Sequence, residues 1–169
     1  MSHTKNKVEW CLKKAEEELK NSGTHRGLVK ARSDKEKAKE HIHKAEHYLS
    51  ATIYLKEGNF SDIGASTVFY AMYHCLLAIA AKFGYESRNQ ECTFALVGGL
   101  IEDGKIDFDK KLLDKIFLWD EEKSKGQTTT GIREQYQYGT GLTLKEDLYS
   151  EQLELAKRVI AKTKEIIEE

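Results

Sequence analysis

Apolar residues recur every three or four positions along this chain, which is the period of an amphipathic helix. One such stretch covers residues 8–19 and is expected to end near Gly23, because glycine often follows a helix C-terminus. Two longer stretches cover residues 35–57 and 61–84, separated by Gly58. The second of them is apolar on nearly all sides, which predicts the central and most buried helix.

Three more helices are predicted in the second half of the chain, at residues 89–101, 108–119 and 148–167. No stretch shows the alternation of apolar and polar residues that is typical of a half-buried strand. We therefore expect an all-α fold, an up-and-down bundle of five or six helices.

Local sequence signals mark the ends of several of these helices. Ser33 and Glu36 have the spacing of a capping box, so Ser33 is expected to cap the helix that follows it. Residues 123–131 are rich in Lys, Ser, Thr, Gln and Gly and are expected to form a flexible loop. A second break is expected at residues 139–143.

The composition favours one folded domain with a largely helical core. The 169 residues include no proline, and 40% of them are hydrophobic and 33% are charged, which is enough to bury a core under a solvated surface. The net charge of −1 excludes a strong overall field toward nucleic acid or membrane. Residues 20–39 are locally basic and could contact RNA phosphates or an acidic partner, but the interspersed glutamates favour a solvated connector.

The three cysteines, Cys11, Cys75 and Cys92, lie far apart and include no C-x-x-C pair, so no zinc site is expected. Two of them occupy apolar helical positions, which predicts small buried side chains. Residues 1–7 are polar, and the most apolar stretch, residues 63–83, is interrupted by polar residues. We therefore expect no signal peptide, no membrane span and a reducing, cytoplasmic location.

Two short motifs point to a protein family. The central predicted helix carries Tyr-Ala-Met-Tyr-His at residues 70–74, and Arg-Glu-Gln-Tyr-Gln-Tyr-Gly at residues 133–139 precedes the last helix. With these motifs the chain resembles the HEPN superfamily. The resemblance covers residues 33–169, so a HEPN-like helical bundle is expected there, preceded at residues 1–32 by a separate N-terminal helix and basic connector.

The resemblance implies a helical bundle that is usually dimeric and uses no metal or cofactor. Many members of the family are ribonucleases, often the toxins of toxin–antitoxin pairs, in which an arginine is followed after a few residues by a histidine. The histidine moves protons near neutral pH, and the arginine stabilises the charge on the phosphate. Other members lack this motif and bind or scaffold partners, often a minimal nucleotidyltransferase.

The sequence contains the arginine of this motif but lacks its histidine. Arg133 matches the arginine, and the window for the histidine holds Tyr138, Gly139 and Thr140. Tyrosine has a pKa of about 10 and is a poor general base at neutral pH. Arg88 is a second candidate arginine, and it too lacks a following histidine. Catalysis by the family's standard mechanism is therefore not expected.

Arg133 and His74 each have a structural and a functional interpretation. Arg133 either forms an ion pair or a cap between helices, or binds a nucleotide or RNA phosphate beside Tyr136 and Tyr138. His74 is expected to be a buried histidine bonded to a neighbouring helix. It is also the best substitute proton carrier if the protein is a nuclease.

A metal site receives little support from the sequence. His43 and His47 lie one helical turn apart, with Glu40 a turn before them, and this spacing suits metal ligands. No third strong ligand is evident, and pairs of histidines at this spacing are common on polar helix faces. No metal or other cofactor is expected.

Three functional hypotheses follow. The leading one is a non-catalytic HEPN binding module, a homodimer that binds a nucleotidyltransferase-type protein, a nucleotide or RNA through Arg133, Tyr136 and Tyr138. The second is a metal-independent ribonuclease toxin of a toxin–antitoxin pair, with His74 as its proton carrier. The third is a structural dimerisation domain that binds no ligand.

Overall fold

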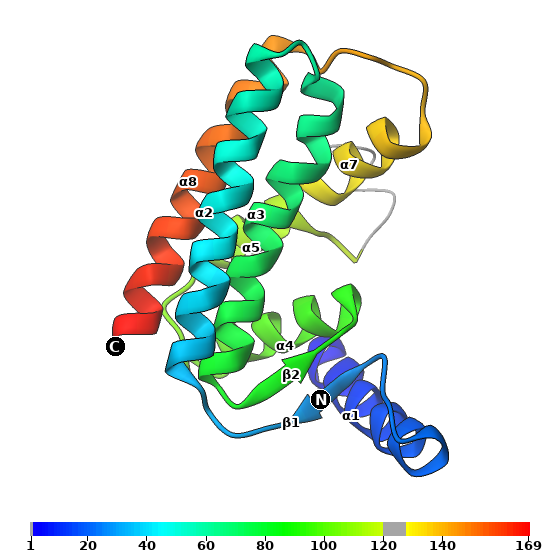
Figure 1. Cartoon of the computed structure of the whole chain (residues 1–169). Helices are drawn as coiled ribbons and strands as arrows, with labels where there is room; N and C mark the ends of the chain where they lie inside the picture. Colours follow the sequence, from blue (N-terminus) through cyan, green and yellow to red (C-terminus); the bar gives the residue numbers. More distant parts are fainter. Residues whose placement is uncertain (1, 120–127) are drawn as a thin grey trace.

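The computed structural model describes residues 2–119 and 128–169, which form seven helices and two short strands (Figure 1). In chain order the elements are α1 His3–Ser22, β1 Leu28–Lys30, α2 Lys35–Glu57, α3 Ser61–Lys82, β2 Tyr85–Ser87, α4 Gln90–Glu102, α5 Lys110–Ile116, α7 Thr129–Tyr138 and α8 Glu146–Glu168. The prediction of an all-α fold is confirmed, because the two strands contribute only three residues each.

Three long helices, α2, α3 and α8, form the main bundle and lie side by side (Figure 1). α2 and α3 are antiparallel and joined by a short turn after Gly58, and α8 packs against both of them. α3 is the centre of the core, with Phe69, Met72 and Leu76 fully shielded from solvent. The prediction that this helix is the most buried one is confirmed, as its nearly uniform apolar surface requires.

The same helix, α3, is long and apolar enough to cross a membrane by length and composition. In the structure, however, 67% of its apolar window is buried among the other helices. This is the environment of the core helix of a folded bundle.

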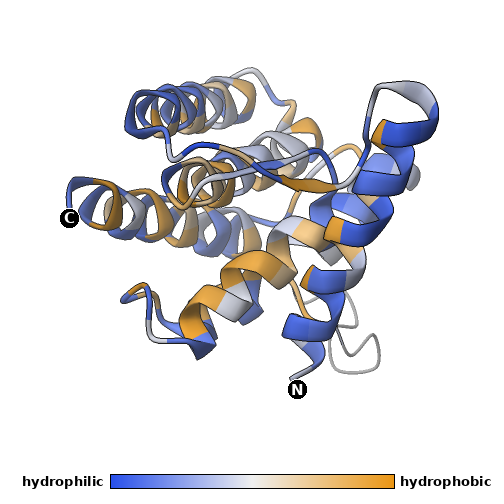
Figure 2. Ribbon diagram, turned by 90° about the horizontal axis from the view of Figure 1, so that it is seen from below, coloured by the Kyte–Doolittle hydropathy of each residue, from blue (hydrophilic) through white to orange (hydrophobic). Residues whose placement is uncertain are grey.

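α1 and α4 form a second layer across the lower end of the bundle (Figure 1). Seen from below, α4 is largely hydrophobic, whereas α1 is mostly hydrophilic (Figure 2). α1 buries Cys11 and Ala15 on its inner face, and Gly23, with a φ of 71°, ends the helix at the predicted place. The N-terminal helix therefore packs on the bundle and does not project from it.

The connector after α1 contains a strand that the sequence pattern does not indicate. β1 pairs with β2 in an antiparallel register, with Leu28 opposite Ser87 and Lys30 opposite Tyr85. Three residues are too few for a period of two to be visible in the sequence. On either side of the connector, the basic stretch at residues 20–39 is solvated, as expected. Its lysines at the end of α1 and the start of α2 pair with carboxylates: Lys20, Lys35, Lys37 and Lys39.

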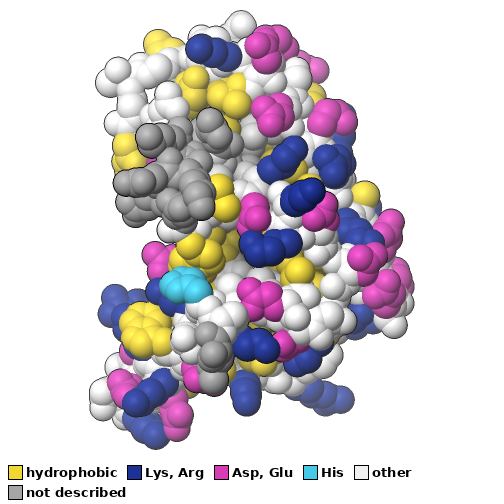
Figure 3. All heavy atoms as spheres, turned by 180° about the vertical axis from the view of Figure 1, so that it is seen from behind, with side chains coloured by type: hydrophobic (Ala, Val, Ile, Leu, Met, Phe, Trp, Pro, Cys, Tyr) yellow, Lys and Arg dark blue, Asp and Glu magenta, His cyan; other side chains and the backbone are white. Residues whose placement is uncertain are grey.

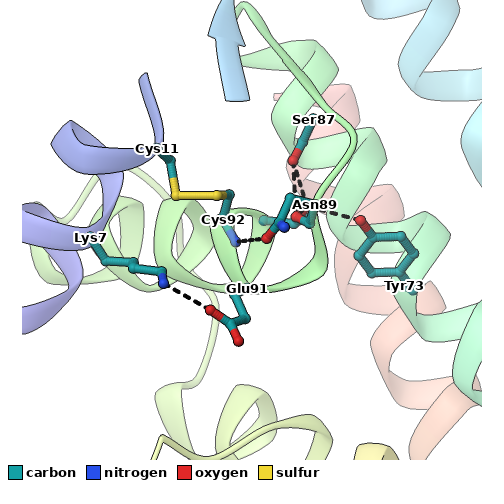
Figure 4. The surroundings of a disulfide bond; sticks show 8 residues. Lys7, Cys11, Tyr73, Ser87, Asn89, Glu91 and Cys92 are labelled. Carbon is teal, nitrogen blue, oxygen red and sulfur yellow. Dashed lines mark hydrogen bonds and ion pairs between the residues drawn. A yellow bond between two sulfur atoms is a disulfide. The ribbon is translucent and has the colours of Figure 1, made fainter. Parts of the chain in front are cut away.

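Cys11 and Cys92 form a disulfide between α1 and α4 (Figure 4). Cysteines of a protein in a reducing compartment are expected to be reduced, and this pair does not meet that expectation. The two residues are 81 positions apart, and only the packing of α1 on α4 brings them together. Cys75 is free and buried, and burial raises the pKa of its thiol to about 12.

The cap of α2 differs from the predicted one. Asp34 is the N-cap residue, and its carboxylate accepts a hydrogen bond from the Lys37 backbone N–H at 2.8 Å. Ser33 instead donates its hydroxyl hydrogen to the carbonyl of Lys82. The prediction of Ser33 as the cap is wrong because this contact with the end of α3 uses its hydroxyl group.

Two other boundaries in the second half of the chain are corrected. α5 ends at Ile116, so Trp119 lies beyond the helix in which it was predicted. Thr128 caps α7 with its side chain, and residues 129–131 form the first turn of that helix instead of a loop. Residues 123–127, the rest of the predicted loop, lie outside the described residues.

Candidate functional site

Arg133 lies on α7 with its side chain turned into the bundle. It follows the buried residue Ile132 and lies one helical turn after Thr129, which is also buried. Residues one turn apart share a helix face, so Arg133 belongs to the face of α7 that packs on α3. Only 7% of Arg133 is exposed.

The guanidinium group of Arg133 connects three helices. Its central carbon lies 4.3 Å from the centroid of the Phe69 ring on α3, within the range of a cation–π interaction. Nη1 donates to Oε1 of Gln90, the first residue of α4, at 3.2 Å. Nη2 donates to Oε1 of Glu134, also at 3.2 Å. Arg133 therefore helps to hold α7 against α3 and α4.

The buried charge of Arg133 is only partly compensated. A guanidinium group has five N–H donors, and its Nε is buried without an acceptor among the described residues. Glu134 is the ion-pair partner found in this part of the chain, and its side chain is 54% exposed. The Nε–H of Arg133 is therefore free to donate a hydrogen bond, but only to an acceptor small enough to enter the bundle.

Tyr138 does not share a surface with the Arg133 guanidinium, whereas Tyr136, three residues after Arg133, lies on a neighbouring part of α7. Tyr136 is half-buried and packs on a second hydrophobic cluster that includes Ile132 and Leu144. Tyr138 ends α7 and is 77% exposed. Five helical residues turn the chain through about 500°, so Tyr138 faces away from the side of α7 that carries Arg133. Ligand binding by these three residues stays a prediction, and Tyr138 does not line a common site with Arg133.

His74 is bonded to a neighbouring helix, as its structural interpretation predicts. Its Nδ1 lies 3.0 Å from Nδ1 of His41 on α2, and its ring stacks on Tyr48 with the centroids 5.5 Å apart. Burial, together with the neighbouring His41, lowers the pKa of His74 to about 4. His74 follows Phe69 by five residues and so lies on a different side of α3 from the Arg133 contact. The structure does not bring Arg133 and His74 together.

The other candidates lie at the surface. Arg88 follows β2, and its Nε donates to the Glu86 carboxylate at 2.8 Å. His43 and His47 are both exposed on α2. Across residues 2–119 and 128–169, no group of three or more His, Cys, Asp or Glu side chains is placed to hold a metal ion.

Two features were missed in the sequence. The first is the role of Gln90 as the partner of Arg133, which depends on tertiary packing and leaves no sequence signal. The second is a group of aromatic and basic side chains on the outer face of α1. This group does leave a signal, because Lys7, Trp10 and Lys14 follow one another at steps of three and four residues.

The fold and motifs agree with a comparison against known families. The family model for the HEPN domain matches residues 38–168, which is well over half of the chain. The matched region includes the Tyr-Ala-Met-Tyr-His run of α3 and also Arg133, whereas α1 and β1 precede it. No curated protein matches the sequence. The chain therefore belongs to the HEPN domain family.

Proposed function

We propose that this protein is a non-catalytic HEPN binding module. The observation that carries the proposal is the position of Arg133, the arginine of the ribonuclease motif. A catalytic arginine has to reach the phosphate of a bound RNA. The guanidinium of Arg133 instead faces Phe69 and Gln90 inside the bundle and is 7% exposed. Its first role is to hold the helices together.

The lack of a proton carrier beside Arg133 supports the same proposal. The window for the histidine ends α7 and continues into an exposed turn, at Tyr138, Gly139 and Thr140. The substitute candidate His74 is bonded to His41. RNA cleavage by the family's standard mechanism needs a histidine that takes the proton of the 2′-hydroxyl, and no histidine follows Arg133 in that window.

A surface at one end of the bundle supports a protein as the partner. Five large apolar side chains, here called the hairpin surface, are 49 to 77% exposed around the α2–α3 turn and the α7–α8 connection: Tyr54, Phe60, Ile63, Tyr138 and Leu142. The backbone N–H of Leu144 donates to Ser61 Oγ at 3.0 Å, which places the α7–α8 connection beside the start of α3. Exposed apolar and aromatic groups of this kind are typical of protein interfaces.

The proposed partner at the hairpin surface is a second copy of the chain. HEPN domains resembling this one are usually dimeric, and members without the catalytic motif often act beside a minimal nucleotidyltransferase. An enzyme of that class is therefore the further partner we propose. Binding of nucleotide or RNA near Arg133 is less well supported, because the guanidinium is enclosed.

The first experiment is RNA cleavage by the purified protein without added metal. The wild-type protein is compared with Arg133→Ala and with His74→Ala, and all three are expected to leave the RNA intact. Cleavage that is present in the wild type and lost in either variant would overturn the proposal and identify a ribonuclease.

The second experiment measures the molar mass in solution by light scattering. The wild-type protein is expected to have twice the chain mass of 19.3 kDa. Tyr54→Glu and Leu142→Glu are expected to give the monomer, because a buried carboxylate at an interface is costly. The matched control is Leu19→Glu, an exposed apolar position on α1, which should leave the dimer intact. A monomeric wild-type protein would contradict the dimer.

A further inference from the structure

The outer face of α1 carries an exposed indole between two lysines. His3, Lys7, Trp10 and Lys14 follow one another at steps of four, three and four residues and so share one side of the helix. Trp10 is 51% exposed. Its ring centroid lies 4.6 Å from Nζ of Lys7 and 4.8 Å from Nζ of Lys14. A flat aromatic surface thus lies between two positive charges at the surface of the molecule.

A second indole adjoins this face. Trp119 is 36% exposed, and Nζ of Lys7 lies 5.9 Å from its ring centroid. The ring is held from behind by Phe117, whose centroid is 4.8 Å away at a right angle. Figure 3 shows hydrophobic and histidine side chains next to Lys or Arg side chains in the lower-left part of the molecule, where α1 lies in that view.

Next to Trp10 there is a pocket of about 330 Å³ between α1, the start of the connector and α4. Arg26 lines the pocket together with Lys14 and with the disulfide cysteines Cys11 and Cys92. The disulfide fixes α1 to α4 at this point (Figure 4). The helix that carries the indole and the lysines therefore keeps its position against α4, which reduces the cost of ordering this part of the backbone around a ligand.

The charges around Trp10 are available to an anionic ligand. Within the described chain, Lys14 and Arg26 make no ion pair. Lys7 pairs with Glu91 at 2.8 Å, but the carboxylate is 58% exposed, and exposed pairs of this kind contribute little and exchange readily. The carboxylate of Glu18, the one acid that lines the pocket, already accepts the backbone N–H of Arg26 at 2.8 Å.

We propose that this face of α1 binds single-stranded nucleic acid. An unpaired base displaces one of the two ammonium groups from over the Trp10 ring and stacks there. The backbone phosphates are held by Lys7, Lys14 and Arg26. The two lysines are seven helical residues apart, about 10 Å along the axis, with the indole between them. Aromatic side chains flanked by cations bind single strands in this way, whereas the bases of a duplex are already stacked on one another.

This proposal is independent of the protein interface described above. The residues of α1 precede the region that matches the HEPN domain, and none of them belongs to the hairpin surface. A monomeric protein, or one with ribonuclease activity, would leave the prediction for α1 unchanged. Likewise, a failure of nucleic acid to bind at α1 would leave the proposed dimer at the hairpin surface unchanged.

The test measures binding of short labelled oligouridine and oligothymidine to the oxidised full chain by fluorescence anisotropy at low salt. Trp10→Ala is expected to weaken binding by about 5- to 100-fold, the effect of losing one stacked base. Trp10→Phe retains an aromatic ring and should lose less. Lys14→Ala should reduce the slope of binding against salt concentration by about one. Oligodeoxyuridine, which differs from oligouridine only in the sugar, then tests whether the site prefers RNA or DNA.

Lys13→Ala is the matched control, because this exposed lysine is the neighbour of Lys14 but lies about 100° around the helix; it should bind as the wild type does. Three results with nucleic acid or heparin would overturn the proposal. They are no binding of either single strand by the wild type, equal binding by Trp10→Ala, and equal binding of heparin, which has charge but no bases. An acidic peptide that binds more tightly than the oligonucleotides, through Trp10, would assign the face to a protein and also reject nucleic acid.

Discussion

His41 and His74 contact each other through their Nδ1 atoms, 3.0 Å apart, across the interface of α2 and α3. One of the two nitrogens must carry the proton and the other must accept it. Burial is the main cause that lowers both pKa values, and that of His74 falls to about 4. Positive lysines nearby, Lys37 for His41 and Lys44 for His74, act in the same direction, while Glu40 opposes the shift at His41.

The histidine pair predicts a specific dependence of stability on pH. The pKa of each histidine is lower in the folded chain than in the unfolded chain, so the unfolded chain binds more protons between these values. The pair therefore contributes fully to the free energy of unfolding above about pH 6.5. This contribution is lost as the pH falls toward about 4. Urea unfolding at several pH values should show the loss, on the order of one hydrogen bond, ~1 kcal/mol.

His74→Asn is the variant that tests this, because asparagine places a polar atom near the position of Nδ1 but does not titrate. Its free energy of unfolding should fall less than that of the wild type between pH 7 and pH 4. Parallel pH profiles for the two proteins would show that the pair does not govern this part of the stability.

Arg133 is predicted to contribute packing more than charge. Arg133→Ala removes the group that covers Phe69 and should lower the free energy of unfolding by about 2 kcal/mol. Arg133→Met keeps most of the volume and removes the buried Nε that lacks an acceptor. It should therefore stay within about 1 kcal/mol of the wild type. Equal, large losses in both variants would instead show that the positive charge itself is required.

The Cys11–Cys92 disulfide is predicted to stabilise the fold substantially. It closes a loop of 81 residues, and native disulfides of small domains contribute about 2–5 kcal/mol. Reduction, or Cys11→Ser, should lower the midpoint of urea unfolding accordingly. Alkylation in urea should modify one thiol, that of Cys75, before reduction and all three cysteines after it. The same alkylation applied to freshly lysed cells would reveal whether the pair is oxidised in its native compartment.

Two glycines are predicted to respond to alanine in opposite ways. Gly84 has a φ of 76°, and a Cβ atom there would lie 3.0 Å from the carbonyl oxygen of Ala31. Gly84→Ala should therefore lower the free energy of unfolding by about 1–2 kcal/mol or more. Gly99 lies inside α4, and a Cβ atom there would meet nothing within 4 Å. Gly99→Ala should raise the stability by about 0.5–1 kcal/mol, and thermal unfolding of both variants checks the pair.

The helices could be predicted from the sequence because their signals are local. The period of apolar residues and Gly58 gave the bounds of α2, and Gly23 gave the end of α1. The choice between Ser33 and Asp34 as a cap could not be predicted, since it depends on a contact with the carbonyl of Lys82. The strands β1 and β2 pair across a long separation and are too short to leave a pattern.

The candidate site could be predicted only in part for the same reason. The missing histidine after Arg133 is visible in the sequence, and the expectation that His74 bonds to a neighbouring helix is met by its contact with His41. The direction of the Arg133 side chain cannot be predicted from the sequence, because an arginine near tyrosines is equally compatible with an exposed and with a buried position. Packing on Phe69 decides it.

The disulfide between α1 and α4 also changes how the chain must fold. In the reduced chain, α1 meets α4 only after a long segment, including both helices of the α2–α3 hairpin, has been closed into a loop. Once the bond has formed, the two segments are neighbours even in the unfolded chain. The docking of the N-terminal helix then becomes a short-range event that precedes assembly of the bundle, so the oxidised chain should refold faster than the reduced one.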